Sequence, residues 1–180
     1  MIQEFIGVHP VLDETNFVAE TAAVIGDVHL GKDSSVWFSA TVRGDVHRIR
    51  IGARSNIQDN AVVHVTNQTA PTTIGNAVTV GHSAIVHGCR VEDQVLIGMG
   101  AIILDHAVIG SRSIVGAHAL VTGGVIIPEE SLVLGSPARV VRRLTPEEVS
   151  SIVTYSDNYV KYKDIYLGRV APDSNPFYDQ

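Results

Sequence analysis

Large aliphatic residues recur at every sixth position over most of the chain. They form four runs, which are Val18, Val24, Leu30, Val36 and Val42; Ile51, Ile57 and Val63; Ile74, Val80 and Val86; and Val91, Ile97, Ile103, Ile109, Val115, Val121, Ile127 and Val133. A period of six fits neither the 3.6-residue period of a helix nor a plain hairpin meander. It indicates short strands separated by tight turns, with one aliphatic side chain of each strand directed inward.

Small residues mark two further positions of this repeat. The residue directly after the aliphatic one is often glycine, as at Gly31, Gly52 and Gly75. The residue four positions after the aliphatic one is usually small, as at Ala22 and Ala40. We expect the glycines to serve turns, where a positive φ or a close backbone approach is needed. Stacked coils then pair as parallel strands about 4.8 Å apart around one core. The pattern predicts an all-β solenoid, a parallel β-helix. The alternative is a β-sandwich, whose strands turn over about every 8–12 residues.

The repeat slips at three places, between Val42 and Ile51, between Val63 and Ile74, and between Val80 and Val91. Residues 66–73 are polar and include Pro71, which is typical of a loop ejected from the coil. Irregularities in a regular solenoid mark candidate functional sites. We therefore expect function close to these slips.

A helix is predicted where the repeat ends, after a turn-like exit at residues 135–139. Thr145 is the expected N-cap, Pro146 the first helical residue, and Glu148 completes a capping box. Gly168 marks the expected stop. Apolar residues at steps of three and four predict a stripe that packs along the solenoid, namely Val149, Ile152, Val153, Tyr155, Tyr159, Val160, Tyr162 and Tyr166. We predict a single domain over residues 1–180, with the β-helix over about 11–140, the helix over 145–168 and a loose tail over 169–180.

Composition narrows the class of protein. The net charge of −6 argues against a nucleic-acid partner, because phosphate binding needs a basic face. No apolar run is long enough for a membrane span, and no signal peptide is visible at the N-terminus. Cys89 is the only cysteine, so an internal disulfide is excluded; we expect a small buried thiol in a reducing cytoplasm.

His64, His82 and His87 lie around the slips and are the candidate metal ligands. Three neutral imidazoles are a standard ligand set for catalytic zinc, with water in the fourth position, and they also suit iron(II) or cobalt(II). Spacing alone leaves the ordinary reading open, in which each histidine lies on a turn or a solvated face. His64 follows its inward residue by one position and His82 by two. We therefore expect that one chain does not direct both side chains at the same metal ion. A ligand supplied by a neighbouring copy of the chain would complete the site.

Several segments together resemble the γ-class carbonic anhydrases. They are R-G-D-V-H at residues 43–47, N-I-Q-D at 56–59, His64, V-G-H at 80–82, H-G-C at 87–89, I-G-M-G at 97–100 and the helix motif N-Y-V-K-x-K-D at 158–164. The chain is most similar to the small bacterial YrdA- and PaaY-type members. The resemblance implies a left-handed β-helix and a homotrimer that hydrates CO2 to bicarbonate with a metal-bound hydroxide at each subunit interface.

The resemblance also implies roles for individual residues. His64 and His87 would come from one subunit and His82 from its neighbour. Arg43 would pair across the interface with Asp45 and Asp59, either to hold the trimer alone or also to shape the site. Gln58 and Asn56 would orient the metal-bound water or bicarbonate. Asn158 and Tyr159, on the helix, would reach the substrate, although Tyr159 also lies on the stripe that packs against the solenoid.

The chain departs from the best-characterised γ-type enzyme at two places. That enzyme resembles this chain in its ligands but carries acidic residues for proton transfer, whereas the segment after His64 has no acid and Val46 replaces a second one. Anhydrase activity is therefore expected to depend on water or buffer. Two alternatives remain, which are an acyl-CoA thioesterase or hexapeptide acyltransferase on the same frame, and a non-catalytic trimer stabilised by metal.

Overall fold

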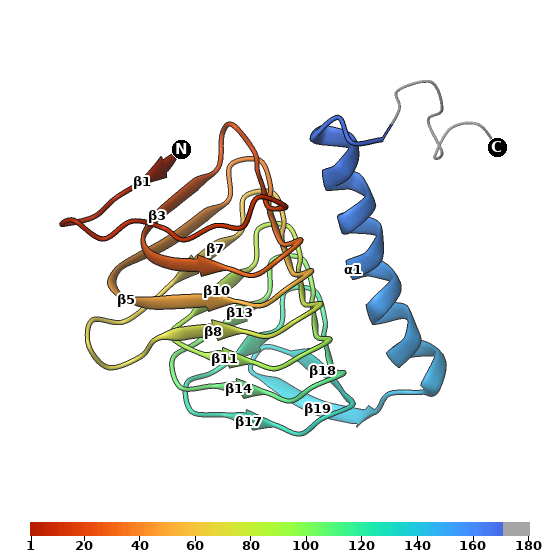
Figure 1. Cartoon of the computed structure of the whole chain (residues 1–180). Coiled ribbons are helices and arrows are strands. Elements are labelled where there is room, and N and C mark those ends of the chain that lie inside the picture. Colours follow the sequence, from red (N-terminus) through yellow and green to blue (C-terminus); the bar gives the residue numbers. More distant parts are fainter. Residues whose placement is uncertain (171–180) are drawn as a thin grey trace.

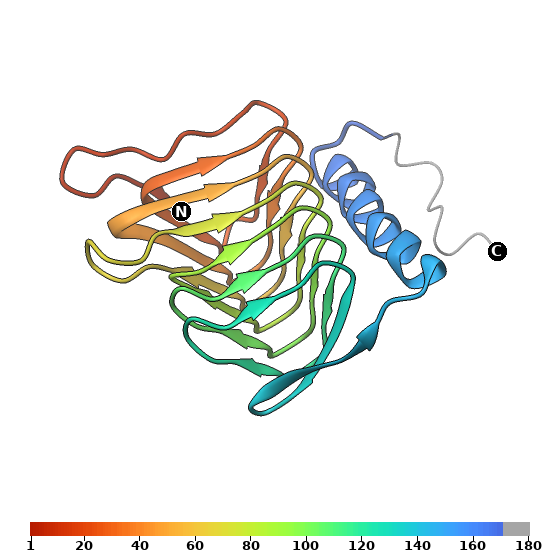
Figure 2. The same cartoon turned by 90° about the horizontal axis from the view of Figure 1, so that it is seen from below.

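The computed structural model describes residues 1–170, which wind into a parallel β-helix flanked by one α-helix (Figure 1). Seen from below, the coils lie one behind another and the helix runs along one side of the stack (Figure 2). Each regular coil contributes one strand to each of three faces, as β9, β10 and β11 do. The predicted solenoid is confirmed, and the sandwich alternative is wrong.

The strands form two hydrogen-bonded sheets. The larger sheet contains β1 (Ile2–Gln3), β3 (Ala23–Leu30), β5 (Thr41–Ile51), β7 (Val62–His64), β8 (Thr72–Ile74), β10 (Ile85–His87), β11 (Arg90–Val91), β13 (Ile102–Ile103), β14 (Val108–Ile109), β16 (Leu120–Val121) and β17 (Ile126–Ile127). The smaller sheet contains β2 (Phe17–Val18), β4 (Ser35–Val36), β6 (Asn56–Ile57), β9 (Thr79–Val80), β12 (Leu96–Ile97), β15 (Ile114–Val115), β18 (Ser131–Gly135) and β19 (Ala138–Arg143).

The aliphatic repeat fills the interior of the coils. Val42 pairs with Val63, Val63 with Val86, and Val86 with Ile103, so the inward residues of successive coils stack in a column. All four side chains are fully buried. Burial of one such side chain contributes about 1.5–3 kcal/mol. The core is therefore the sum of many equivalent layers.

The glycines of the repeat serve close approach and not positive φ. A Cβ on Gly52 would lie 2.5 Å from the carbonyl carbon of Gly75 in the next coil. Positive φ falls instead on corner residues such as Ser39 and Asn60, at 58° and 59°. Glycine supplies the positive φ at other corners, as Gly100 does at 66°. Hydrogen bonds to the coils on either side hold the backbone there, as from the Asn60 amide to the Phe38 carbonyl at 3.0 Å.

Two of the three slips in the repeat, those after Val42 and after Val63, are excursions of the chain. β5 continues from the face of β7 onto the face of β8, pairing through its first and its last residues. Residues 65–71 leave the coil after β7 and close on themselves through a bridge between Thr66 and Ala70. Both excursions project on the side of the solenoid away from α1 (Figure 1).

Both ends of the solenoid differ from the expected boundaries. At the N-terminus β1 already pairs with β3, well before residue 11. At the other end β18 and β19 form an antiparallel hairpin around the expected exit, and pairing continues to Arg143. The hairpin closes this end of the smaller sheet with an antiparallel strand in place of a further parallel coil.

The helix α1 (Pro146–Tyr166) has the predicted signals at both ends. Thr145 is the N-cap, and the capping box with Glu148 is complete. Gly168 has a φ of +67°, and the Arg169 amide donates to the Asp164 carbonyl, which is the pattern of a Schellman motif. The tail expected over 169–180 lies, from residue 171, outside the described residues. Within the described part of the chain, no helix is long and apolar enough to cross a bilayer.

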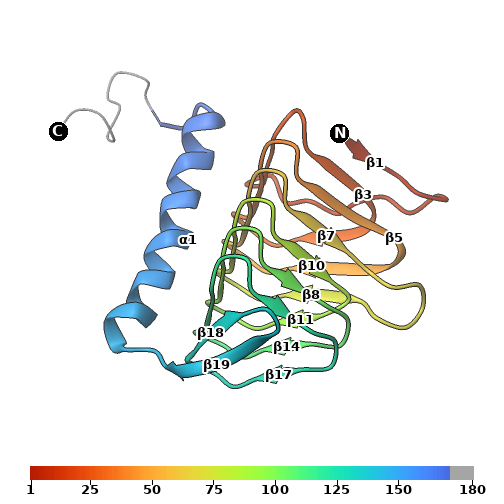
Figure 3. The same cartoon turned by 180° about the vertical axis from the view of Figure 1, so that it is seen from behind.

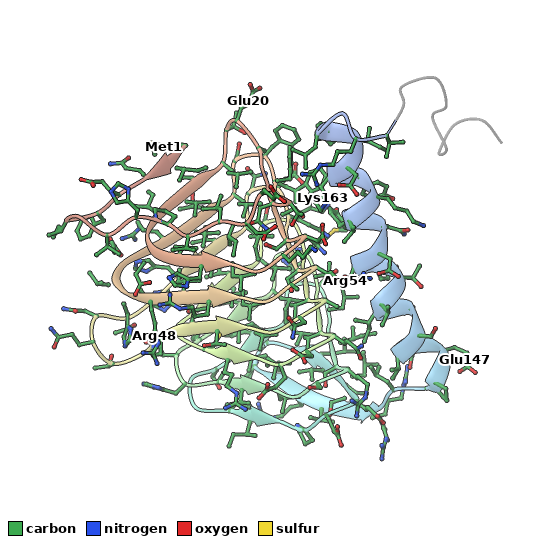
Figure 4. All side chains as sticks on the ribbon, viewed as in Figure 1. Met1, Glu20, Arg48, Arg54, Glu147 and Lys163 are labelled. Carbon is green, nitrogen blue, oxygen red and sulfur yellow. The ribbon has the colours of Figure 1, made fainter. Side chains whose placement is uncertain are left out.

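The helix packs on the smaller sheet, where it contacts β4 and β9. Its buried residues are Ile152, Ser156 and Lys163, so the predicted apolar stripe is only partly right. Tyr155 and Tyr166 are exposed, although the ring of Tyr166 touches those of Phe17, Trp37 and Phe38. Figure 4 shows Lys163 between α1 and the coils, and its ammonium group contacts Asp33 at 3.0 Å and Asp164 at 2.7 Å. A buried ion pair therefore contributes to helix docking.

Replacing Lys163 with alanine tests this docking contact. The variant leaves two partly buried carboxylates without their shared cation, and we expect a loss of about 1.5–3 kcal/mol in the free energy of unfolding. Lys161→Ala, an exposed lysine of the same helix, is the matched control. Urea denaturation measures both. Equal stability of the two variants would contradict the contribution of the buried pair.

Acid should weaken the start of α1 through Glu148. Hydrogen bonds from Arg142 and from the Thr145 backbone lower the pKa of Glu148 from 4.5 to about 2. Because the folded pKa lies below the unfolded value, the stabilisation is present above about pH 4.5 and is lost as the pH falls towards 2. We expect Glu148→Gln to be less stable than wild type at pH 7 and equal to it near pH 2. Glu20→Gln, at an exposed position (Figure 4), should show no such pH-dependent difference in thermal melts.

Candidate metal centre

His64 and His87 lie side by side at the ends of two adjacent strands, β7 and β10 (Figure 3). They are direct partners in the parallel register, and His64 Nδ1 lies 3.1 Å from His87 Nε2. They are 23 residues apart because residues 65–71 are ejected between them. The slip in the repeat is therefore what brings these two side chains together. We call His64 and His87 the histidine pair.

A carboxylate holds the outer nitrogen of each ring in the histidine pair. Asp45 Oδ1 lies 3.0 Å from His64 Nε2, and Asp105 Oδ1 lies 2.6 Å from His87 Nδ1. A carboxylate accepts hydrogen bonds, so these partners assign the N–H groups to the outer nitrogens. The two inner nitrogens then face each other with lone pairs. A cation between them satisfies both.

The donor set fits a divalent metal ion. Two nitrogens bound tetrahedrally to zinc at about 2.0–2.1 Å lie about 3.3–3.4 Å apart. The observed separation of 3.1 Å is close to that value. A carboxylate on the second nitrogen of a metal-binding histidine is the usual supporting arrangement. Within residues 1–170 of one chain, however, no three ligand side chains gather at one point.

Asp45 also receives an ion pair from Arg43 within the same chain. Burial raises the pKa of Asp45, but hydrogen bonds from His64 and Arg43 outweigh it and hold this pKa below its ordinary value. The expected pairing of Arg43 across an interface is therefore not needed to neutralise Asp45. Asp59, the other expected partner of Arg43, contacts His82 instead.

Asp105 is a site residue that the sequence reasoning missed. It follows β13 and lies 18 residues, one regular coil, after His87. Burial raises its pKa, but hydrogen bonds from Thr66 and His87 outweigh this effect and lower it. The signal was available, because residues one coil apart stack.

His82 lies apart from the histidine pair. It precedes β10, whereas His87 ends it, so the two lie at opposite ends of the strand. His82 Nδ1 is 3.0 Å from Asp59 Oδ2. Sequence phase predicted that one chain does not direct His64 and His82 at one metal, and the separation agrees with this prediction.

Asn56 and Gln58 precede His82 by one coil, at β6 and just after it. The side chains of both are buried. Gln58 Nε2 donates to Asn56 Oδ1 at 3.1 Å, and Asn56 Nδ2 donates to Thr79 Oγ1 at 3.0 Å. The amide of Gln58 is therefore held in place by Asn56. We call Asn56, Gln58, Asp59 and His82 the His82 corner.

The helix brings Tyr159 towards this corner. The ring of Tyr159 packs on Trp37 at a centroid distance of 5.1 Å. Burial, followed by the charge of Asp59, raises the pKa of Tyr159 to about 12. The evident contribution of Tyr159 is therefore packing against the solenoid, which is what its place on the apolar stripe of the helix predicts. Asn158 lies next to it on α1 and is half-buried.

Thr72 and Cys89 lie close to the histidine pair. The Thr72 hydroxyl donates to the His64 carbonyl and accepts from the Gly88 amide, which ties the end of the ejected segment to both strands. Cys89 is buried, and this burial raises its pKa to about 12. It is the expected buried thiol, and it is not available as a nucleophile.

Comparisons with known proteins show the family of this chain. The pattern of the bacterial transferase hexapeptide repeat matches residues 88–123. The chain is 57% identical to a Methanocaldococcus jannaschii protein named "Probable carbonic anhydrase", with 82% of this chain and 92% of that protein covered. It is 43% identical to Protein YrdA of Escherichia coli, with 93% and 94% covered.

Two further comparisons concern a plant relative and a solved structure. The chain is 46% identical to "Gamma carbonic anhydrase 1, mitochondrial" of Arabidopsis thaliana, with 93% of this chain and 62% of the plant protein covered, so it spans less than two thirds of that relative. A hexapeptide transferase family protein from Anaplasma phagocytophilum superposes with a TM-score of 0.89 at 39% identity, with 92% and 98% covered. On these matches, the chain belongs to the γ-carbonic anhydrase family of hexapeptide-repeat proteins.

Proposed function

We propose that this protein catalyses the reversible hydration of CO2 to bicarbonate, as a homotrimer with one divalent metal ion at each subunit interface. The observation that carries the proposal is the pair of facing ring nitrogens, His64 Nδ1 and His87 Nε2, which lie 3.1 Å apart on rings that are each held by a carboxylate. The names of the relatives support CO2 as the substrate.

The separation of the ligands supports the trimer. One chain offers the histidine pair at one end of β10 and the His82 corner at the other, so a rotation that places the pair of one subunit against the His82 corner of the next completes three identical sites. The outer face between them is apolar, with Val62 and Leu104 exposed on β7 and just after β13. Such a face suits burial against a second copy.

The residues of this chain divide the work between binding and orientation. Asp45 and Asp105 keep the two rings in the tautomers that present lone pairs. Gln58, held by Asn56, is placed to hydrogen-bond the substrate oxygens, and Asn158 and Tyr159 border the His82 corner. When bound, a divalent metal supplies a Lewis acid that makes a water molecule reactive towards CO2 near neutral pH. Zinc suits this ligand set, and iron(II) or cobalt(II) are the alternatives.

Proton removal is the weak step in this arrangement. Residues 65–71, which follow the first ligand, contain no acid, and Val46 follows Asp45. No carboxylate on these two segments can relay a proton from the site to solvent. Water and buffer must therefore carry it, and we propose an activity that rises with buffer concentration.

We propose a cytoplasmic location. Cys89, the only cysteine, is a buried free thiol. A chain that uses no disulfide for stability suits a reducing compartment.

One observation favours a second activity, namely acyl transfer or acyl-CoA hydrolysis. The Anaplasma phagocytophilum protein, at 39% identity, is described as a member of the hexapeptide transferase family. Acyl transfer of this kind needs one histidine as a base, whereas here two histidines face each other between two carboxylates. The metal site therefore favours the anhydrase, and a CoA-ester panel separates the two.

The first test measures CO2 hydration by the zinc-loaded protein in imidazole buffer. We expect catalysis above the buffer rate, increasing with imidazole, and a loss of about 100-fold or more in kcat/KM for His64→Ala and His87→Ala, since the metal loses a ligand. His118→Ala, an exposed corner histidine, is the control. Absence of hydration together with CoA-ester hydrolysis would replace the proposal with the thioesterase. Absence of both, with a trimer that chelator dissociates, would leave a metal-stabilised assembly.

The second test asks whether the site is shared between subunits. His82→Ala and His87→Ala trimers are each inactive, but after dissociation and mixing in equal amounts, about a quarter of the interfaces combine an intact histidine pair with an intact His82. We expect about a quarter of the wild-type rate. Mixing His64→Ala with His87→Ala is the control and should restore nothing, because both residues belong to the same half. No recovery in the first mixture would contradict the shared site.

A further inference from the structure

Asp105 lies where the turn after β13 passes under the end of β10. Both of its carboxylate oxygens are engaged, Oδ1 with His87 Nδ1 at 2.6 Å and Oδ2 with the Thr66 hydroxyl. Among the described residues its only ion-pair partner is His87. Asp45, by contrast, shares its charge between His64 and Arg43. The ion pair of Asp105 is therefore directed at one imidazole.

The space for this carboxylate comes from Gly88. A Cβ on Gly88 would lie 2.5 Å from Asp105 Oδ1, and the φ of Gly88 is +57°. Any side chain at this position would displace the carboxylate from His87. The backbone fixes the same contact, because the His106 amide donates to the Gly88 carbonyl at 2.7 Å. Glycine is thus required here by the lack of space for a Cβ.

We propose that Asp105 is the positioning residue of the metal ligand His87, held in place by Thr66 and admitted by Gly88. By accepting the Nδ1–H it fixes the tautomer in which Nε2 carries the lone pair, and its charge raises the basicity of that nitrogen. Thr66 prevents the carboxylate from rotating away. The inference deepens the proposed function and rests on it, because it takes His87 as a ligand.

The geometry also orders the effects of substitutions. Asp105→Asn can still accept the Nδ1–H but removes the charge, whereas Asp105→Ala removes both. Thr66→Val leaves His87 and Asp105 in contact and removes only the hydroxyl that orients the carboxylate. The expected loss of metal affinity therefore increases from Thr66→Val to Asp105→Asn to Asp105→Ala.

The test measures the Kd of the purified full-length protein for Zn2+ by chelator competition. We expect Asp105→Asn to weaken zinc binding by about 10–100-fold. The visible spectrum of the Co2+-loaded variant should change in intensity, since the ligand field changes with the basicity of His87. Asp93→Asn is the matched control. Asp93 also lies on a turn, where Oδ1 accepts from the Asn76 amide at 2.7 Å, and it touches no histidine.

A second measurement separates positioning from general stability. 15N NMR of the metal-free protein reports the tautomer of His87, which should be Nδ1–H in wild type and Asp93→Asn but not in Asp105→Ala. An unchanged tautomer in Asp105→Ala, or a zinc Kd of Asp105→Asn within about twofold of wild type, would overturn the inference. A wild-type protein that binds no zinc would instead overturn the proposed function.

Discussion

The candidate metal site depends on one interaction, the close approach of two imidazole nitrogens. His64 Nδ1 and His87 Nε2 are 3.1 Å apart, and in neutral rings neither can donate, because Asp45 and Asp105 accept from the opposite nitrogens. Such an arrangement is unfavourable without a cation and favourable with one. The stacked coils keep it in place, because both histidines are on adjacent strands of one sheet and cannot separate without breaking the register.

The solenoid also explains why the site is incomplete in one chain. Corners of the coils are separated by whole strands, so groups at two corners meet only through another copy. His82 and Asp59 are at one corner and the histidine pair at another. In our proposal the trimer brings together groups that lie apart in one coil, while the inward column of large side chains remains aliphatic. Binding and folding thus use different sides of the same short strands.

Much of the fold could be predicted from the sequence, because the core residues themselves form the six-residue repeat. Val42, Val63 and Val86 were predicted to face inward and stack. The corners were harder to predict. Ser39 and Asn60 adopt a positive φ that depends on contacts with neighbouring coils, and no local sequence pattern predicts it. The prediction of an apolar stripe on the helix was wrong at Tyr155 for a similar reason. The buried residues of the helix include Lys163, whose partner Asp33 is distant in sequence.

The sequence indicated the candidate ligands but not the carboxylates that hold their rings. Histidines near the slips could be found by inspection, and the family motif assigned their partners. Asp105 was missed because its role depends on coil stacking and on the space left by Gly88, neither of which a ligand motif contains. The pairing of Arg43 with Asp45 inside one chain also required coordinates.

In our proposal, a metal ion joins the histidine pair of one subunit to His82 of another. Anomalous diffraction at the zinc absorption edge, from crystals of the zinc-loaded protein, locates this ion. We expect one peak per chain, at about 2.0–2.1 Å from His64 Nδ1, His87 Nε2 and a nitrogen of His82 from a neighbouring subunit. No peak between the two histidines, or a peak held by residues of one chain alone, would contradict it.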